Sequence, residues 1–348
     1  MQPEILKLFE EAIKIGASDL ILKPGSPPVY RINQHLVFSE YESLAAQQMY
    51  NLLLPVLDAA QQENLQQHFK TSSIFTLNRT ITRIRTFIYK LRGGYAGTFR
   101  FVPNKVPNIK SLNLPASLEN LASIRKGIFL VTGPVGNGKT TTISALTQSI
   151  NERLSRYIIT VDKLIEVVYQ PIKSVFTQIE VGKGLSTYSE AVSNALREDA
   201  DVIVLGDFSD KDVVEQAFIA SETGHLVLAS IQASGSASAI EKIVDLFPIE
   251  KQEEIRGQLS QNLIGILSQR LIPSIEYKKK ASIAYELLFA NPNIRNIIKG
   301  CKYSLLSSTL LNSKENGCIS FKESIEKLLK DESLDKDYLR DLLKEVEG

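Results

Sequence analysis

Tryptophan is absent from this chain of 348 residues, and cysteine, methionine and histidine occur only two, two and three times. Two cysteines are too few for a disulfide framework, so we expect free thiols in the reducing cytoplasm. So few histidines and cysteines also leave no cluster of the kind that holds zinc. The formal net charge is only +1 at pH 7, which predicts no nucleic acid and no anionic membrane as a direct partner.

Long apolar runs are missing as well. No stretch approaches the roughly 20 apolar residues that a transmembrane segment needs, and the first four residues do not resemble a signal peptide. Membrane association is therefore expected only through a partner protein. What is present is ordinary globular composition, with 43% hydrophobic and 23% charged residues, in a length that suits two domains.

The first predicted domain, residues 1–102, has the pattern of a compact α+β module. Helical periodicity is expected over 3–15 and 44–69, and strand patterns over 18–22, 29–32 and 73–102, the last with a hairpin turn at Gly93-Gly94. Residues 103–117 are rich in proline and asparagine and predict a linker.

The second predicted domain, residues 118–348, has an α/β pattern. Apolar strands alternate with helices, which implies right-handed crossovers and a mainly parallel sheet. The predicted strands are 127–131, 157–161, 202–205 and 226–230, and the predicted helices start near 140 and cover 188–197 and 211–222. From about residue 240 onward the chain is expected to be mostly helical.

One segment between a predicted strand and a predicted helix fits the phosphate-binding pattern G-x-x-x-x-G-K-[ST] in full. Its glycines allow backbone N–H groups to surround phosphate oxygens, and the helix directs its positive end at the same anion. We expect Lys139 to reach the β- and γ-phosphates and Thr140 to ligate Mg²⁺. The candidates for ATP binding in this segment are Gly133, Pro134, Gly136, Asn137, Gly138, Lys139, Thr140 and Thr141.

An acidic residue follows another apolar strand, at Gly206-Asp207. In P-loop enzymes an acid at such a strand end holds Mg²⁺ or orients the attacking water. Asp207 is therefore the candidate for both the catalytic and the metal-binding role. The alternative is an aspartate that only caps the next helix.

Further motifs resemble the type IV pilus retraction ATPases, the PilT family, within the type II/IV secretion ATPases. Residues 196–201 are similar to the family's "LREDPD" run, Thr223-Gly224-His225 to its His box, and residues 294–298 to its "AIRNLI" segment. Residues 17–20 and the arginine-bearing segments at 83–85 and 99–100 resemble the family's opening module. The resemblance covers nearly the whole chain, in order.

This resemblance implies a RecA-like P-loop NTPase core with a smaller PAS-like α+β N-terminal domain, assembled as a homohexameric ring. It implies an ATP-hydrolysing motor that drives pilus retraction and twitching motility, cytoplasmic and bound to an inner-membrane pilus platform protein. Arg85 and Arg100 would then contact nucleotide phosphate. Asp162, Glu166 and His225 would act in catalysis or in signalling between subunits.

The chain departs from the family at its catalytic motifs. Asp207 replaces a glutamate. In the acidic box Asp162 is a shortened acid, Lys163 replaces a second acid, and only Glu166 persists. Ser209 replaces an arginine, and Gln232 replaces the second histidine of the His box. A shortened carboxylate can misplace the attacking water, and a lysine competes with Mg²⁺ for nearby acids. Because one misplaced polar contact in a transition state costs ~10²–10³ in rate, low turnover is expected.

Two other functions stay open at this point. The chain could be a catalytically weakened, ATP-binding regulatory or accessory subunit of such a ring. It could also be a RecA-like nucleic-acid motor, although the near-neutral charge and the lack of tryptophan disfavour a strand-binding groove.

Overall fold

The computed structural model describes residues 3–77, 82–102, 106–182, 187–276, 279, 281–313 and 317–347. The chain divides into two compact units, residues 1–105 with 273–280, and residues 106–272 with 281–348. The expected linker, 103–117, begins outside the described residues. From residue 106 it belongs to the second unit, where Ile109 and Leu114 are buried in a hydrophobic core.

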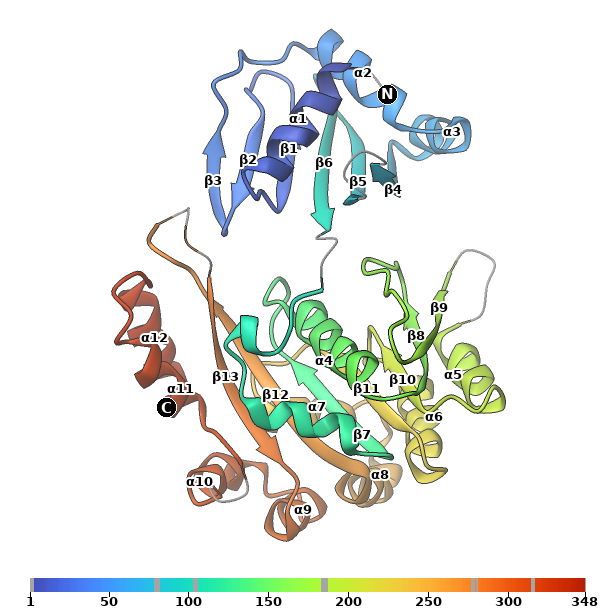
Figure 1. The fold of residues 1–348 in the computed structure, drawn as a ribbon, viewed down its shortest axis with the longest axis vertical. Helices are drawn as coiled ribbons and strands as arrows, with labels where there is room; N and C mark the ends of the chain where they lie inside the picture. Colours follow the sequence, from blue (N-terminus) through green and yellow to red (C-terminus); the bar gives the residue numbers. More distant parts are fainter. Residues whose placement is uncertain are drawn as a thin grey trace. The chain divides into compact units, whose positions relative to one another are not determined.

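The first unit is an antiparallel sheet with helices, coloured in blues in Figure 1. Its six strands follow the order β3-β2-β1-β6-β5-β4. They are β1 (Asp19–Leu22), β2 (Val29–Ile32), β3 (His35–Phe38), β4 (Lys70–Leu77), β5 (Thr82–Leu91) and β6 (Gly94–Val102). The helices are α1 (Pro3–Lys14), α2 (Ala46–Leu53), the 3₁₀ turn η1 (Leu54–Val56) and α3 (Ala59–His68).

Local sequence explains most of this unit. Helix α1 places Ile5, Phe9 and Ala12 on one face, and all three are fully buried in the core. The expected helix over 44–69 is instead divided, because Pro55 lies in η1 and Asp58 caps a new helix by accepting from the Gln61 backbone N–H. Strand β3 was not expected from the sequence.

The second unit is built on a seven-stranded sheet in the order β13-β12-β7-β11-β10-β8-β9 (Figure 1). All neighbours are parallel except β12 and β13. The strands are β7 (Gly127–Thr132), β8 (Tyr157–Asp162), β9 (Val175–Glu180), β10 (Val202–Leu205), β11 (Leu226–Ile231), β12 (Leu263–Ile272) and β13 (Ser282–Phe289). The mainly parallel α/β core expected from the sequence is confirmed.

Helices cover both faces of this sheet. They are η2 (Lys110–Leu112), η3 (Ala116–Ser123), α4 (Lys139–Arg153), α5 (Tyr188–Arg197), α6 (Lys211–Glu222), α7 (Ser236–Val244), α8 (Ile249–Asn262), α9 (Pro292–Lys299), η4 (Tyr303–Leu305), α10 (Leu306–Leu311), α11 (Phe321–Leu328) and α12 (Lys336–Glu347). The central strand β7 alternates between two cores. Ile128 and Leu130 pack with α5, α6 and α8, whereas Phe129 and Val131 pack with α4 and η3.

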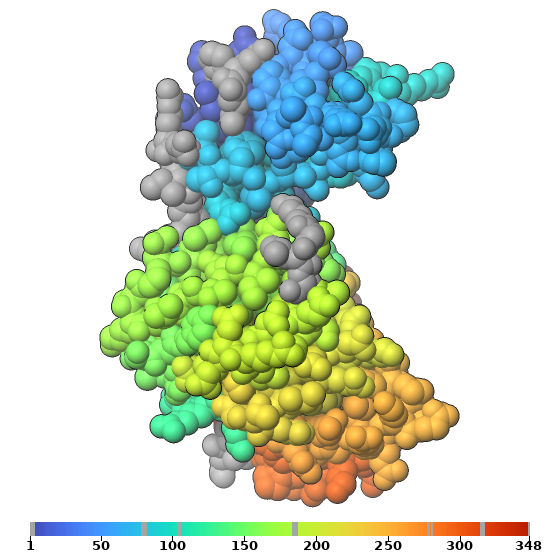
Figure 2. All heavy atoms as spheres, turned by 90° about the vertical axis from the view of Figure 1, so that its right-hand side faces the viewer, coloured from blue at the N-terminus to red at the C-terminus, as the bar shows by residue number. Residues whose placement is uncertain are grey.

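The expectation of a mostly helical segment from about residue 240 is wrong for residues 263–289. Within this range Leu263–Ile272 form β12 and Ser282–Phe289 form β13, whereas α8 before them and the segments from α9 onward are helical as expected. The reason is that β12 is mostly buried, and its apolar residues do not show the alternation that distinguishes a half-buried strand from a helix. Strand β9 was also not expected. It forms the edge of the sheet that lies opposite β13, on the side of the second unit that faces the viewer in Figure 2.

Candidate active site

Parallel pairing brings the predicted site residues to one edge of the second unit's sheet. Thr132 at the end of β7 pairs with Ile231 of β11, Leu205 of β10 with Val161 of β8, and Asp162 with Glu180 of β9. The segments that follow these strands therefore share the carboxyl edge of the sheet, where ligands bind in open α/β folds. The P-loop, Gln232, Asp207 and the acidic box lie along this edge.

The P-loop has the backbone geometry that its glycines were expected to supply. Gly136 and Gly138 both have φ of +79°, in the region that side chains with a Cβ rarely adopt. Gly138 is the N-cap of α4 and supplies no side-chain cap to the first turn of that helix. The first-turn N–H groups of α4 are thus left for an anion, which is the arrangement that binds phosphate.

The lysine of the P-loop lies inside the loop. Lys139 Nζ donates to the carbonyls of Gly133 and Pro134, each at 2.9 Å. Burial lowers the pKa of Lys139, while the charge of Asp207 acts in the opposite direction. Thr140 and Thr141 are exposed in the first turn of α4, as the metal-binding and nucleotide-binding roles predicted for them require.

Strand β12 packs against the P-loop and forms hydrogen bonds with it, a contact that the sequence did not predict. Gln269, fully buried, donates from Nε2 to the Asn137 carbonyl at 2.5 Å, and the Leu271 N–H donates to Asn137 Oδ1 at 2.7 Å. A Cβ on Gly133 would stand 2.5 Å from the Gln269 carbonyl. Asn137 and Gly133 are therefore required by packing against β12 as well as by phosphate geometry. The sequence signal was the polar triplet Ser268-Gln269-Arg270 between two apolar segments.

Asp207 lies at the strand end as predicted, and both of its carboxylate oxygens have partners. Lys163 Nζ donates to Oδ2 at 2.7 Å, and Ser209 Oγ donates to Oδ1 at 2.6 Å. Burial acts to raise the pKa of Asp207, but these hydrogen bonds and the charge of Lys163 outweigh it and hold the pKa below its usual value. Both partners occupy positions where the chain departs from the family pattern. The helix cap on α6 is supplied by Asp210 instead.

Asp162 lies deeper in the same edge. Burial, together with the charges of Glu166 and Glu180, raises its pKa to about 7. Gly206 is the neighbour that leaves it room, because a Cβ there would collide with Asp162 Oδ1. The Tyr188 hydroxyl lies on the same side, and its pKa is raised by burial and by the charge of Asp162. The two acids of the acidic box, with Glu180 of β9, thus form a group in which Asp162 exchanges its proton near neutral pH.

Gln232 follows β11 and enters the site through its backbone. Its carbonyl accepts from Lys242 Nζ at 2.9 Å, and Lys242 also lowers the pKa of Lys139 through its charge. Helix α7 behind this segment is fixed by the buried Glu286, which accepts from the Ser236 N–H at 3.1 Å. Lys242 and Glu286 were not singled out from the sequence, because their partners are distant in the chain.

Within the second unit, the fold does not bring His225 to the carboxyl edge of the sheet. It precedes β11, and its carbonyl accepts from the N–H of Gly127, where β7 begins. Six residues of strand, about 3.3 Å each, separate this amino edge from the P-loop. The His225 ring bonds to the Ala220 carbonyl at 2.9 Å and to Thr223 Oγ1 at 3.1 Å.

The two predicted arginines belong to the first unit. Arg85 of β5 and Arg100 of β6 are direct cross-strand partners. Arg100 Nε donates to Oδ1 of the buried Asp19 at 2.9 Å, and Asp19 lies in the segment that resembles the family's opening module. The ion pair fixes the Arg100 side chain on the exposed face of the sheet.

The donor set suits a magnesium nucleotide better than a metal bound by protein alone. Among the described residues there is no group of three or more histidine, cysteine, aspartate or glutamate side chains that could hold a metal ion. If the predicted ligands Thr140 and Asp207 hold Mg²⁺, they would leave most coordination positions to phosphate and water, as Mg²⁺ prefers. Fold and site together define a P-loop nucleotide-binding protein of the RecA-like class.

Comparison with known proteins narrows this class. Residues 106–326 match the family described as "Type II/IV secretion system protein". The chain is 31% identical over 303 residues to a twitching motility protein of Neisseria gonorrhoeae, covering 87% of this chain and 80% of that protein. It is also 31% identical to the type IV pilus retraction ATPase PilT of Pseudomonas aeruginosa, covering 88% of each. A crystal structure of the retraction motor PilT with bound ADP superposes with a TM-score of 0.84 at 35% identity, covering 99% of this chain and 98% of that one.

The chain therefore belongs to the type II/IV secretion ATPase family, and within it is similar to the PilT retraction ATPases along nearly its full length. The resemblance inferred from the motifs and the fold class that it implied are confirmed. Within the described part of the chain, no helix is long and apolar enough to cross a bilayer.

Proposed function

We propose that this chain binds ATP with Mg²⁺ and hydrolyses it slowly, as a motor subunit that drives retraction of a type IV pilus. The observation that carries the proposal is the P-loop cradle beside Asp207 on one sheet edge. The names and coverage of the relatives support the pilus role. Slow turnover is part of the proposal because Asp207 is engaged by Lys163.

Each site residue has a role in this proposal. Backbone N–H groups from Gly133 to Thr141 surround the phosphates, and Lys139 exchanges its carbonyl partners for β- and γ-phosphate oxygens. Thr140 and Asp207 would hold Mg²⁺, which supplies charge stabilisation at the phosphates when bound. Asp207 and Glu166 orient the attacking water. Asp162, with a pKa of about 7, can hold or accept a proton beside them.

The other predicted site residues would act between the subunits of a ring. In a homohexamer with ATP at subunit boundaries, Arg85 and Arg100 of one subunit would contact phosphate bound to the next, where an arginine stabilises transition-state charge. His225 would signal across the same boundary, which fits its position away from the P-loop of its own chain. The ring would work on the cytoplasmic side of the inner membrane, attached to a pilus platform protein.

A second candidate function is favoured by the ion pair between Lys163 and Asp207. A subunit whose water-orienting acid is held by an internal lysine would bind ATP and regulate an intact ring without turning over itself. The two candidates share the P-loop and differ only in hydrolysis.

Steady-state ATP turnover of the purified protein with Mg²⁺ separates them. Wild type is compared with Lys139→Ala, which removes the phosphate contact, and with Asp207→Glu, which restores the longer acid. Turnover of wild type above Lys139→Ala supports the motor. Turnover in Asp207→Glu alone supports the regulatory subunit. The pilus role is tested by expression in Pseudomonas aeruginosa lacking PilT, where restored twitching is expected for a motor and its absence, with active enzyme, refutes this assignment.

A further inference from the structure

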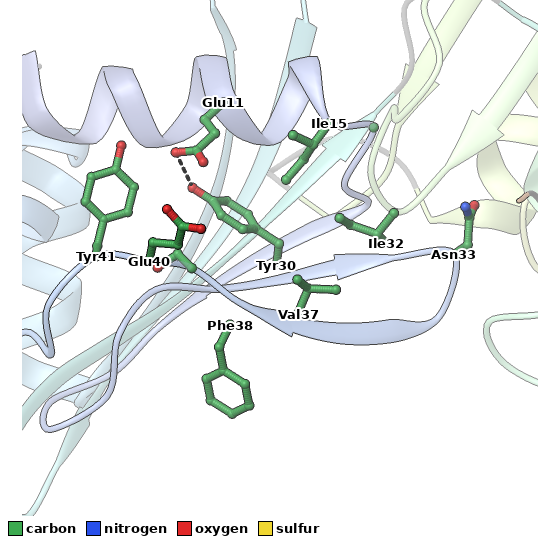
Figure 3. A pocket seen from close by; sticks show the side chains of 11 residues that line it. Glu11, Ile15, Tyr30, Ile32, Asn33, Val37, Phe38, Glu40 and Tyr41 are labelled. Carbon is green, nitrogen blue, oxygen red and sulfur yellow. Dashed lines mark hydrogen bonds between the residues drawn. The ribbon is translucent and has the colours of Figure 1, made fainter. Parts of the chain in front are cut away.

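The first unit contains a pocket of about 890 Å³ that takes no part in the nucleotide site. Figure 3 shows it between helix α1 and strands β2 and β3. Its lining comes from α1, from β2 and β3, and from the segment that follows β3. This volume lies in the range of about 300–1,000 Å³ that is usual for small-molecule sites.

The polar part of the pocket is acidic. Glu11 and Glu40 both line it, and Figure 3 shows their carboxylates on the same side as the Tyr30 hydroxyl. Tyr30 Oη donates to Glu11 Oε2 at 3.0 Å, and a hydrogen bond to Glu11 raises the pKa of Tyr41. A carboxylate accepts about four hydrogen bonds, so Glu11 retains acceptor capacity. No lysine, arginine or histidine is among the residues that line this pocket.

The remaining walls are aromatic and aliphatic. The side chain of Tyr41, which is 49% exposed, lines the pocket together with Ile15 and Val37, whereas the ring of Phe38 points away from Glu11 and Tyr30 in Figure 3. Ring faces attract cations, and an apolar wall suits the methylene stem of an amine. In addition, Ser39 Oγ is buried and has no hydrogen-bond partner within the described part of the chain, so the lining includes a polar atom that a ligand could satisfy.

We propose that this pocket binds a small organic cation of the alkyl diamine or polyamine class. The carboxylates of Glu11 and Glu40, on one side of the pocket, match one ammonium group, and the aromatic and aliphatic walls match the methylene chain attached to it. A metal ion does not fit, because the described residues contain no group of three or more metal-binding side chains. A concave site of this size favours a free amine over a lysine presented by a protein surface.

The test is equilibrium dialysis of the full-length protein, without nucleotide, against radiolabelled spermidine. Saturable binding is expected, with displacement by unlabelled 1,5-diaminopentane but not by 1,5-pentanediol, which has the same length and no charge. Glu40→Lys supplies an internal ammonium group and should weaken spermidine binding at least tenfold. Glu11→Gln should weaken it as well, while its amide oxygen still accepts from Tyr30. Glu42→Gln, an exposed glutamate outside the pocket, is the matched control.

Several outcomes overturn the proposal. Absence of saturable binding at millimolar spermidine would overturn it. If Glu42→Gln weakened spermidine binding as much as Glu40→Lys does, the binding would reflect diffuse surface charge, and the proposal would also be overturned. Equal displacement by the diol would indicate an apolar groove without cation recognition. If spermidine does not bind but a lysine-containing peptide does, and Glu40→Lys weakens the binding of that peptide, the pocket would be assigned to a protein partner instead. Thermal unfolding of each variant shows whether it is folded, and because ATP turnover is not the readout, this test is independent of the proposed function.

Discussion

The ion pair between Lys163 and Asp207 allows a direct test of whether Lys163 restrains the proposed catalytic acid. Its ammonium group lies 2.7 Å from Asp207 Oδ2, and its side chain is 72% exposed. The change that isolates the charge is Lys163→Met, because methionine retains an unbranched stem and lacks the ammonium group. If the pair restrains Asp207, the variant should hydrolyse ATP faster than wild type.

The expected gain follows from the strength of an exposed ion pair. Double-mutant cycles on such pairs give about 0.2–1 kcal/mol. If Asp207 must release Lys163 before it accepts a hydrogen bond from the attacking water, the barrier falls by the same amount when the pair is removed. A barrier change of that size corresponds to about a 1.4- to 5-fold higher kcat. The melting temperature should fall by no more than about 4 °C.

The measurement is phosphate release at saturating ATP, repeated over a range of Mg²⁺ concentrations. Lys173→Met is the matched control, since Lys173 is an exposed lysine whose ammonium group donates to the Arg153 carbonyl at 3.4 Å. It should leave kcat unchanged. A fall of about 10²-fold or more in Lys163→Met would refute the reasoning, because it would mean that the ammonium group stabilises charge in the transition state.

Three further predictions concern the same edge. Burial and two neighbouring carboxylates raise the pKa of Asp162 from 3.8 to about 7, so the folded protein binds a proton that the unfolded chain releases, and stability is lost as pH rises from about 4 to about 7. Asp162→Asn should therefore gain melting temperature relative to wild type at pH 8 but not at pH 4; an equal difference at both would contradict this. Gly206→Ala should lower the free energy of unfolding, measured by chemical denaturation, by about 1–3 kcal/mol because the new Cβ would meet the Asp162 carboxylate. Gly257→Ala is the control: it lies in open space within α8 and should leave stability unchanged or raise it. Gln269→Leu removes the side-chain donor to a P-loop carbonyl. The KM for ATP should therefore rise, and the free energy of unfolding should fall by about 1–3 kcal/mol. An unchanged KM would argue against support of the P-loop by β12.

Local pattern was enough to predict the strands and helices that flank the P-loop. The strands β7, β8, β10 and β11 are short apolar runs bounded by polar or glycine residues, which is the pattern of a buried parallel strand. Strand β12 was missed because its ten residues are long enough to read as a helix, and β9 because its burial is only intermediate along most of its length. In both cases the sheet, rather than local preference, determines the conformation.

The site was predictable where its residues are contiguous. The P-loop and Asp207 are read from runs of eight residues, but Gln269 bonds to a residue 132 positions earlier, and Lys163 to one 44 positions later. No pattern within one strand contains those pairs. The position of His225, by contrast, follows from chain direction alone. It precedes its strand whereas the P-loop follows its strand, and in a parallel sheet these two positions lie at opposite edges.

The two sides of the site therefore differ in how they tolerate change. On the phosphate side, Gly133, Asn137 and Gly138 are fixed both by the anion that they must surround and by strand β12 beneath them. On the acidic side, Lys163 and Ser209 contact Asp207 from partly exposed positions, where substitutions cost little stability. Substitution can thus slow hydrolysis without loosening nucleotide binding. If turnover is slow, as proposed above, this chain would remain in its ATP-bound state for longer than a protein in which the corresponding acid is unrestrained, while the contacts of the P-loop with phosphate stay unchanged.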